Sequence, residues 1–386
     1  MTNLEQLVQE LCPDGVEYQC LEDCCIILDN KRTPITKAAR KAGIYPYYGA
    51  NGIQDYIADY IFDGKFILVG EDGSVLTSNN TPVVNWVEGK VWVNNHAHII
   101  AEKSGTSLRY LFHYLQTVNV APLIHGNIPK FTGKDFRTLK IPHPPLEVQQ
   151  EIVRILDHFT ELTAELTAEL TARKKQYYYY RNRLMSHLQD SQTVQLRSVI
   201  AHSCSGATPS KSNSDYYTDG TIPWLRTQDV RFNEIYSVDS FITEKAVAET
   251  GAKWIPKNCV IVAISGATAG RCAINKIPIT TNQHCLNLVI EDKKALYKYI
   301  YYCICNQHEE LLAKKQGARG DLNASLILGT EIPLPPLPEQ RRIVSILDRF
   351  DTLCNDLTSG LPAEIAARQK QYEYYRDKLL TFKERV

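Results

Sequence analysis

The sequence predicts an α+β protein with an internal pseudo-two-fold duplication, made of two α/β domains and two long helices. Its 386 residues exceed what one hydrophobic core usually organises. Two sequence blocks, one rich in proline and one rich in tyrosine, each occur twice and in the same order. Within and between these blocks, apolar residues recur mostly at three- and four-residue steps, which is the period of an amphipathic helix.

The repeated blocks define the two halves. IPHPPLEVQQEIVRILDHF at 141–159 returns as IPLPPLPEQRRIVSILDRF at 332–350, and RKKQYYYYRNRL at 173–184 returns as RQKQYEYYRDKL at 368–379. The connection between the blocks is longer in the second copy, by one helical turn if that copy is helical throughout. Upstream the copies match more faintly, as in FILVGEDG at 66–73 and VIVAISG at 260–266.

Strand-like apolar runs precede each block and predict the α/β domains. They lie at 66–69, 91–93, 260–264 and 286–290, between segments rich in Gly, Asn and Pro. We therefore expect a first domain at 1–140, with a short N-terminal helix, and a second domain at 191–331. Helical regions at 141–190 and 332–386 follow them.

Proline ends before each helical pattern begins, so the first helix is expected from about 147 to 188. A second helix with a matching apolar stripe is expected to pair with it, and Gly360 and Pro362 are expected to break or kink that second helix. The pattern alone leaves both a parallel and an antiparallel pairing open.

The first helix contains the tetrad ELTA three times in tandem. Each copy would add about 6 Å of length and about 40° of rotation, so the copy number could act as a ruler between two domains. The tetrad could equally be a tolerable helix with inward leucines and solvated glutamates, or the product of slippage in a repeated coding sequence. The repeat comprises Glu161, Leu162, Thr163, Ala164, Glu165, Leu166, Thr167, Ala168, Glu169, Leu170, Thr171 and Ala172.

Composition narrows the function classes. Lys plus Arg and Asp plus Glu both number 43, so any nucleic-acid surface has to be local. The sequence has neither a signal-peptide pattern nor a long apolar run, and we expect a cytoplasmic protein without a membrane segment. The eleven cysteines form no CxxC pair and are expected to be reduced, mostly buried thiols. His96 and His98 could form a metal pair, but no carboxylate lies at ligand spacing in the sequence, so strand histidines are the preferred interpretation and no metal is expected.

Taken together, the repeated blocks, the tandem ELTA and the GATPS and IPW motifs at 206–210 and 222–224 resemble the DNA-specificity subunits of type I restriction-modification systems. The resemblance covers essentially the whole chain. It implies two target-recognition domains, each reading one half of a bipartite site in double-stranded DNA, held apart by conserved helices that pair antiparallel, like a coiled coil. It also implies that the tetrad number sets the unread spacer and that two methylation subunits dock on the helices, with two restriction subunits able to join.

The resemblance also implies that this chain is not an enzyme. S-adenosylmethionine, and ATP with Mg²⁺, would be held by the partner subunits, which methylate adenine and cut DNA, and none is expected here. The sequence itself agrees, because it lacks an N/D-P-P-Y/F methylation motif and a GxxxxGK[ST] loop, and SGATAGR at 265–271 lacks the lysine of such a loop. A self-contained methyltransferase or nuclease, and a helical scaffold that binds no DNA, are the alternatives.

Bases are distinguished by Arg or Lys on guanine and by Asn or Gln on adenine, so loops rich in these residues are the reading candidates. In the first domain they are Lys31, Arg32, Asn51, Asn79, Asn80, Asn127 and Lys130, with Tyr47 and Tyr48 bracing the surface or supporting an extruded base. In the second domain they are Lys211, Arg226, Gln228, Arg231, Arg271, Gln316 and Arg319. The tyrosine-rich blocks supply the residues expected to contact partner subunits: Gln176, Tyr177, Tyr180, Arg181, Gln371, Tyr372, Tyr375 and Arg376.

Overall fold

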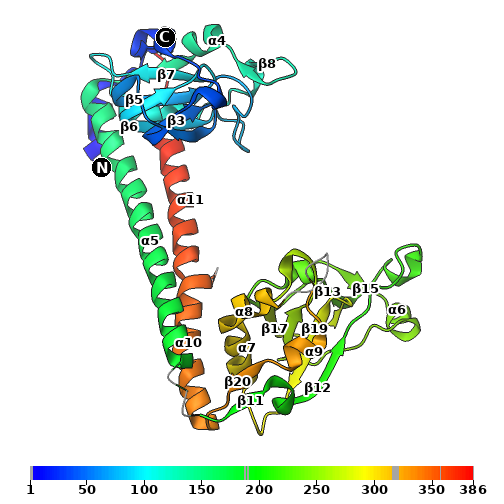
Figure 1. Ribbon diagram of the computed structural model, residues 1–386. Coiled ribbons are helices and arrows are strands. Elements are labelled where there is room, and N and C mark those ends of the chain that lie inside the picture. The colour runs from blue at the N-terminus through cyan, green and yellow to red at the C-terminus, as the bar shows by residue number, and fades with distance from the viewer. Residues whose placement is uncertain (1–2, 187, 189–190, 315–320, 357, 386) are drawn as a thin grey trace. The chain divides into compact units, whose positions relative to one another are not determined.

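The computed structural model describes residues 3–186, 188, 191–314, 321–356 and 358–385, and the chain divides into two compact units (Figure 1). Unit 1 is Met1–Thr167 with Ala363–Val386, and unit 2 is Ala168–Pro362. The first boundary therefore falls inside the ELTA repeat, in the middle of one continuous helix. Each unit combines a globular part, here called the module, with segments of two helices.

Unit 1 is built on a six-stranded sheet with the order β2-β7-β5-β6-β3-β4. The long hairpin β5–β6 is antiparallel, whereas β3 lies parallel to β6. The elements in chain order are α1 (Asn3–Leu11), β1 (Tyr18–Cys20), α2 (Leu21–Cys24), β2 (Ile26–Ile27), η1 (Asp29–Lys31), η2 (Lys37–Ala39), β3 (Ala42–Gly49), β4 (Gly52–Ile57), β5 (Phe62–Gly70), β6 (Val84–Val93), β7 (Ala97–Ala101), α3 (Leu108–Leu115), η3 (Ala121–Leu123), β8 (Ile124–His125), β9 (Lys130–Phe131), α4 (Gly133–Arg137), β10 (Lys140–Pro142), α5 (Leu146–Ser186) and α11 (Leu361–Leu379).

The core of unit 1 joins the sheet to the first turns of α5. Strand β5 is a fully buried apolar run from Phe66 to Val69, as the sequence predicts. Helix α3 packs against β5 and β6. Val148, Ile152 and Leu156 of α5 are buried in the same apolar cluster as α3, so the helix begins as part of the module core.

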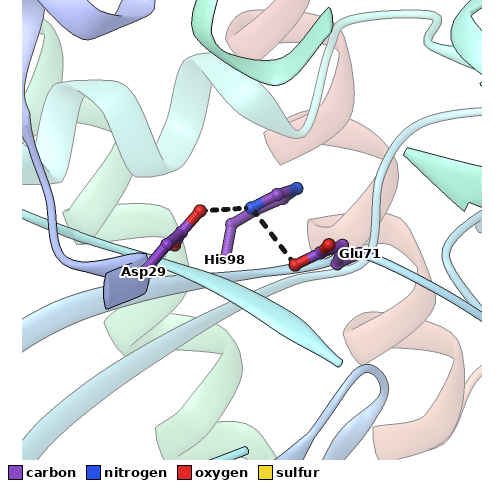
Figure 2. Close-up of side chains that lie close together, drawn as sticks. All are labelled: Asp29, Glu71 and His98. Atoms are coloured by element: carbon purple, nitrogen blue, oxygen red, sulfur yellow. Dashed lines mark hydrogen bonds and ion pairs between the residues drawn. The ribbon is translucent and has the colours of Figure 1, made fainter. Parts of the chain in front are cut away.

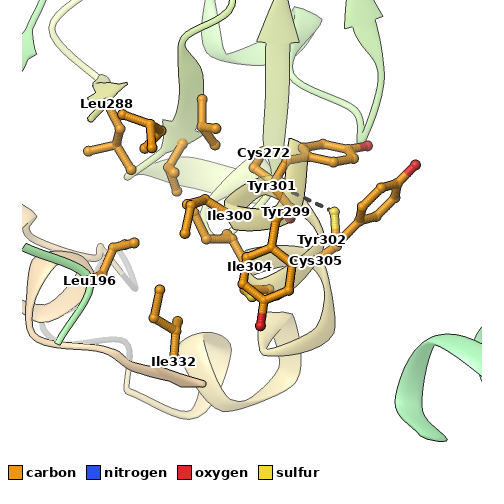
Figure 3. Close-up of a cluster of buried hydrophobic side chains, with 14 of the residues drawn as sticks. Leu196, Cys272, Leu288, Tyr299, Ile300, Tyr301, Tyr302, Ile304, Cys305 and Ile332 are labelled. Carbon is orange, nitrogen blue, oxygen red and sulfur yellow. Dashed lines mark hydrogen bonds between the residues drawn. The ribbon is translucent and has the colours of Figure 1, made fainter. Parts of the chain in front are cut away.

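Unit 2 has a five-stranded sheet, β12-β19-β16-β17-β14, and a three-stranded sheet, β15-β13-β18. Helix α7 packs on β16, β17 and α10, and its buried residues belong to the apolar cluster shown in Figure 3. The elements are β11 (Thr193–Gln195), η4 (Leu196–Val199), β12 (Ile200–Ser205), η5 (Ser214–Tyr216), β13 (Ile222–Leu225), η6 (Thr227–Asp229), β14 (Glu234–Ile235), β15 (Phe241–Ile242), α6 (Glu244–Glu249), β16 (Val260–Ala263), η7 (Gly266–Thr268), β17 (Cys272–Asn275), β18 (Thr280–Thr281), β19 (Cys285–Ile290), α7 (Tyr297–Asn306), α8 (His308–Ala313), α9 (Ala324–Leu328), β20 (Glu331–Pro333) and α10 (Leu337–Asn355).

Each unit pairs one half of α5 with one of the C-terminal helices, and the paired helices run in opposite directions. In unit 1, α5 leaves the module while α11 returns to it, and the ring of Phe159 stacks on Tyr375 at 5.3 Å. In unit 2, Phe350 of α10 stacks on Tyr180 at 5.6 Å, and Leu184 of α5 lines the same groove as Arg342 and Ile346 of α10. The expected antiparallel arrangement is therefore present inside each unit.

The second helix is not continuous. Helix α10 ends at Asn355 and α11 begins at Leu361, so the interruption expected from Gly360 and Pro362 is confirmed. The extra residues of the second copy do not add a helical turn, because the residues that the structure describes between the two helices, 356 and 358–360, are not helical. A Cβ on Gly360 would lie 2.5 Å from the carbonyl oxygen of Thr352, so this bend requires glycine. Pro362 occupies the first turn of α11, where its missing N–H costs nothing.

A buried glutamine fixes the helix start to the module in both units. The Gln149 carbonyl oxygen accepts from the Ser107 N–H at 2.8 Å, and its amide donates to Pro144 O at 2.8 Å and Gly105 O at 3.3 Å. Gln340 repeats the pattern in unit 2: it accepts from Leu296 N–H at 2.9 Å and donates to Pro335 O at 2.8 Å and Lys294 O at 3.3 Å. Both glutamines are fully buried.

The eleven cysteines carry free thiols and nine of them are buried, in agreement with the sequence analysis. Among the described helices, none combines the length and apolarity needed to cross a bilayer.

We predict that Gln149→Leu accelerates hydrogen exchange of the Ser107 amide and of the first turn of α5, because the leucine leaves buried donors and acceptors unpaired at a cost of about 1–3 kcal/mol each. Exchange of the Leu296 amide in unit 2 should stay unchanged. Gln340→Leu is the matched control and should show the reverse pattern. Equal acceleration of exchange at both amides in both variants would contradict a local role for each glutamine.

Candidate nucleic-acid interface

In unit 1, four loops meet at one end of the sheet. They are 29–36, 70–73, 94–96 and 126–130, and backbone hydrogen bonds join them. The Glu71 N–H donates to His96 O at 2.8 Å, and the Gly73 N–H donates to Pro129 O at 2.9 Å. The Arg32 guanidinium donates to Ala97 O at 2.6 Å. Loops at a sheet edge that are held by such bonds are a common place for recognition residues.

Charged side chains gather beneath these loops. Figure 2 shows His98 between Asp29 and Glu71, with His98 Nδ1 2.7 Å from Asp29 Oδ2 and 3.6 Å from Glu71 Oε2. Its Nε2 lies 3.0 Å from the carbonyl oxygen of Phe131. Both ring nitrogens thus face oxygen atoms that can accept a hydrogen bond. Burial raises the pKa of Asp29, but the hydrogen bond from His98, its charge and the Ile99 N–H outweigh burial and lower that pKa overall.

The Arg32 guanidinium makes its hydrogen bonds within the protein. Its Nη1 lies 2.6 Å from Glu71 Oε2, and its Nε donates to Asp29 O at 2.9 Å. Its side chain is 12 % exposed. The structure therefore argues against the predicted base-reading role of Arg32, because its donors already hold three loops together. The sequence could not reveal this, since Asp29, Glu71 and Ala97 come together only on folding.

Asp29, Glu71 and His98 also have ligand atoms close enough to hold a metal ion, which the sequence spacing did not suggest. A metal would need the lone pair of a His98 nitrogen and would have to displace Arg32 from Glu71. Lys130 adds a further positive charge, 3.4 Å from Glu71 Oε1. We therefore interpret the group as an ion-pair cluster. His96, by contrast, lies in the turn before β7 and not in the strand as expected.

We expect Zn²⁺ to leave the thermal unfolding midpoint of the protein unchanged, because the cluster is already neutralised by Arg32 and Lys130. His98→Gln should lower the stability of unit 1 by about 3 kcal/mol, as expected when one member of a buried ion pair is removed. Differential scanning calorimetry with and without Zn²⁺ measures both effects. A midpoint that Zn²⁺ raises in the wild type but not in His98→Gln would establish a metal site instead.

Unit 2 repeats the loop framework without the charged cluster. The Ile264 N–H donates to His284 O at 2.9 Å, as Glu71 does to His96, and the Leu322 N–H donates to Ile264 O at 2.8 Å, as Phe131 does to Glu71. By strand register, Leu286 takes the place of His98. The backbone scaffold is therefore the same in both units, while the side chains under the loops differ.

The other predicted reading residues of unit 1 are mostly exposed. Tyr47 is the exception: it is buried, and its hydroxyl is bonded to the backbone of Ile35, while the Arg40 guanidinium lies 4.0 Å from its ring. This position fits bracing of the surface and argues against support of an extruded base; Tyr48 is half-buried. Exposed on the loops and turns around the sheet are Lys31, Asn51, Asn79, Asn80 and Asn127, and Lys130 is exposed at the start of β9.

In unit 2, Arg231 is exposed and its Nε donates to the carbonyl oxygen of Gln228 at 2.7 Å. Arg226 is half-buried, and its Nε finds no acceptor among the described residues. Arg271 is half-buried in the turn before β17, and Lys211 and Gln228 are exposed. Gln316 and Arg319 lie outside the described residues.

A carboxylate on each repeated helix forms hydrogen bonds and an ion pair with a helix of its module. In unit 1, Asp157 Oδ1 lies 2.8 Å from both Arg109 Nε and His113 Nε2, and His113 Nδ1 lies 2.9 Å from the Tyr372 hydroxyl. Burial lowers the pKa of His113 despite the opposing effect of Asp157. Burial raises the pKa of Asp157, but the hydrogen bonds from His113 and Arg109 lower it overall.

The corresponding carboxylate of unit 2 uses different partners. Asp348 Oδ2 lies 2.9 Å from Lys298 Nζ, and its Oδ1 accepts from the Tyr302 hydroxyl at 2.6 Å. Burial and the nearby Asp348 raise the pKa of Tyr302, so this phenol stays protonated. The sequence analysis missed both carboxylates and both buried glutamines. Their identical places in the repeated blocks were the available signal.

We predict that unit 1 loses stability as the pH falls through about 6.5, the ordinary pKa of an unfolded histidine. Because the folded pKa of His113 is lower, the unfolded chain binds a proton first, so the stabilisation is complete above that pH and declines below it. His113→Tyr, which copies Tyr302, should remove this part of the decline. Hydrogen exchange of α3 between about pH 7.5 and 5.5 measures it, with α7 of unit 2 as the control. An unchanged slope in the variant would contradict the assignment.

The residues expected to contact partner subunits divide into inward and outward groups. Tyr177 and Tyr372 are buried within their own units, so the structure argues against direct partner contact by either ring. Tyr180 and Tyr375 are partly covered by the phenylalanine stacks. The Arg376 guanidinium binds Asp377, and that of Arg181 lies over Tyr177. Gln176 and Gln371 are exposed, and the sequence analysis missed Tyr179 and Tyr374, which are also exposed and occupy matching places in the two blocks.

These observations define a class of protein with two repeated modules. Each module carries a group of loops at one end of its sheet, here called the loop edge, which is suited to recognition. Each module also packs on a long helix through buried hydrogen bonds. The family model of the type I restriction modification DNA specificity domain matches residues 13–173 and 189–367. The chain belongs to this family.

Relatives and solved structures agree with this assignment. A Haemophilus influenzae protein whose name assigns it to the type I restriction enzyme specificity subunits is 36% identical over 398 residues, covering 99% of this chain and 98% of its own. The EcoR124I/EcoR124II specificity subunit of Escherichia coli is 39% identical over 290 residues, covering 72% of this chain and 71% of its own. The S subunit from M. genitalium shares the fold, with a TM-score of 0.62 at 14% identity over 95% of this chain and 96% of that one.

Family membership sets the broad function. The chain confers DNA sequence recognition and assembles with other subunits of a type I restriction-modification system. Specificity subunits are non-catalytic, so the alternatives of a self-contained methyltransferase and of a scaffold that binds no DNA are set aside.

Proposed function

We propose that the two modules are target-recognition domains, each reading one half of a bipartite site in double-stranded DNA. One observation carries this proposal: the module-to-helix junction is the same in both units, down to the hydrogen bonds of Gln149 and Gln340, whereas the side chains around the loop edges differ. Equal junctions would present both edges in the same way to their helices. Unlike edges would read unlike sequences.

Helix α5 is the proposed spacer. Its tetrads form an unbroken helix in which the glutamates are exposed and the leucines are half-covered. Thr163 donates to Phe159 O and Thr167 donates to Thr163 O, both at 2.8 Å, so the hydroxyls are satisfied within the helix. No residue of the tetrad is needed for a special backbone geometry. A copy of the tetrad can therefore be added or removed while the helix continues, with a change of about 6 Å in length.

The repeated helices α5, α10 and α11 are the proposed docking site of two methylation subunits, which two restriction subunits can join. Tyr179 and Tyr374 fit this role because they are large, exposed and equivalent in the two repeats. Tyrosine is enriched where proteins meet, since its ring is apolar and its hydroxyl can still bind water or a partner. S-adenosylmethionine, and ATP with Mg²⁺, would be held by those subunits.

Changing the number of tetrads tests the spacer. We expect insertion or deletion of one ELTA to change the number of unread base pairs between the half-sites and to leave both half-sites intact. The measurement is selection from random DNA by the complex with methylation subunits. The complex is the right material because a chain of zero net charge gains little from phosphate attraction alone.

A control insertion of four residues within 358–360, which precede α11 and are not helical, should change the gap less. Altered half-sites with an unaltered gap would contradict the spacer. A wild-type complex that enriches no bipartite site would contradict the proposed function as a whole.

A further inference from the structure

One short turn has the same internal structure in both units although the modules otherwise differ. It is 94–96, before β7, in unit 1 and 282–284, before β19, in unit 2. The sequences are Asn-Asn-His and Asn-Gln-His. The turn belongs to the loop edge of each unit and was not among the reading candidates chosen from the sequence.

The first asparagine of each turn is buried and holds the backbone. Asn94 Oδ1 accepts from the His96 N–H at 2.8 Å, and Asn282 Oδ1 accepts from the His284 N–H at 3.2 Å. Their own N–H groups donate to Tyr48 O at 3.1 Å and Leu225 O at 2.9 Å. With the histidine carbonyls also bonded, as described above, the turn is fixed at three points in each unit.

The second residue of each turn carries an exposed amide. Among the described residues, none makes a hydrogen bond with the Asn95 side chain, while the backbone carbonyl oxygen of Asn95 accepts from Arg32 Nη1 at 3.5 Å. In unit 2, the Gln283 amide oxygen accepts from the Thr208 hydroxyl, and its nitrogen lies 3.2 Å from His284 Nε2. An amide has two donor hydrogens and two acceptor lone pairs, so Gln283 is oriented and keeps one donor and one lone pair free.

We propose that Asn95 and Gln283 each read a base of the half-site of their own unit; this rests on the function proposed above. Adenine is the base that such an amide fits, because its N6 amino group and N7 present one donor and one acceptor side by side in the major groove. A fixed backbone favours this role, since a side chain on a rigid turn loses less freedom on binding. The scaffold asparagines set the position, and the exposed amides make the contact.

The neighbouring histidines orient the turn. His96 Nδ1 lies 2.5 Å from Asp72 Oδ1, which connects the turn to the loop after β5. His284 faces Gln283.

The test is random-DNA selection with complexes that contain Asn95→Ala or Gln283→Ala. Asn95→Ala should lose the preference at one position of one half-site, with affinity for the selected site falling roughly 5- to 100-fold. The other half-site should be unchanged. Gln283→Ala should do the same in the opposite half-site, so each variant is the control for the other. Gln192→Ala, an exposed amide beside β11, should change neither half-site.

Three outcomes would overturn the proposal while leaving the bipartite function intact. The first is unchanged half-sites in both variants, and the second is a loss of preference in both half-sites from a single variant. The third is an equal loss of affinity for all sequences, with a salt dependence that corresponds to about one phosphate contact fewer. The last would identify a phosphate contact. A wild-type complex that selects no bipartite site would instead refute the proposed function.

Discussion

The constraint on which the structure depends is the buried attachment of each module to its helix. No covalent geometry fixes the angle at which the chain leaves β10 or β20 and enters a helix. A glutamine amide that bonds three backbone groups does fix it, and the two attachments use the same bonds. Because an unpaired buried polar group costs about 1–3 kcal/mol, a tilted helix would forfeit several such bonds together. Module and helix therefore behave as one body within each unit.

The same framework carries unlike side chains because main-chain bonds hold it. The bond from Glu71 to His96 and the bond from Ile264 to His284 join backbone atoms, so neither depends on what those side chains are. Unit 1 fills the space under its loops with an ion-pair cluster, whereas unit 2 places Leu286 there. The junction carboxylates show the same freedom, with Arg and His around Asp157 but Lys and Tyr around Asp348. A scaffold of this kind tolerates divergence at the surface that reads DNA.

Features that depend on local sequence could be predicted, whereas features that depend on residues brought together by folding could not. The long helix, its apolar stripe and the break at Gly360 depend on local periodicity and on single residues, and all three are present. The role of Arg32 depends on Glu71, which is 39 residues away in the chain, so no local pattern could separate an internal ion pair from a base contact. The burial of Tyr177 could not be predicted for a similar reason, because a helix repeat shows which residues share a face but not which face meets the module. The Asn-x-His match was visible in the sequence, yet its meaning required the hydrogen bonds.

Charge at the loop edge of unit 1 limits how DNA can be bound. Arg32 is neutralised by Glu71, and Lys130 lies 3.4 Å from the same carboxylate. The salt-dependent part of DNA affinity scales with the number of phosphates that free cations neutralise, so few such contacts remain at this edge. What remains is short-range hydrogen bonding from a rigid surface, which discriminates between bases but attracts DNA weakly from a distance. Such a surface gains most from a partner that supplies the non-specific attraction, and this matches a chain that recognises DNA as one subunit of a larger complex.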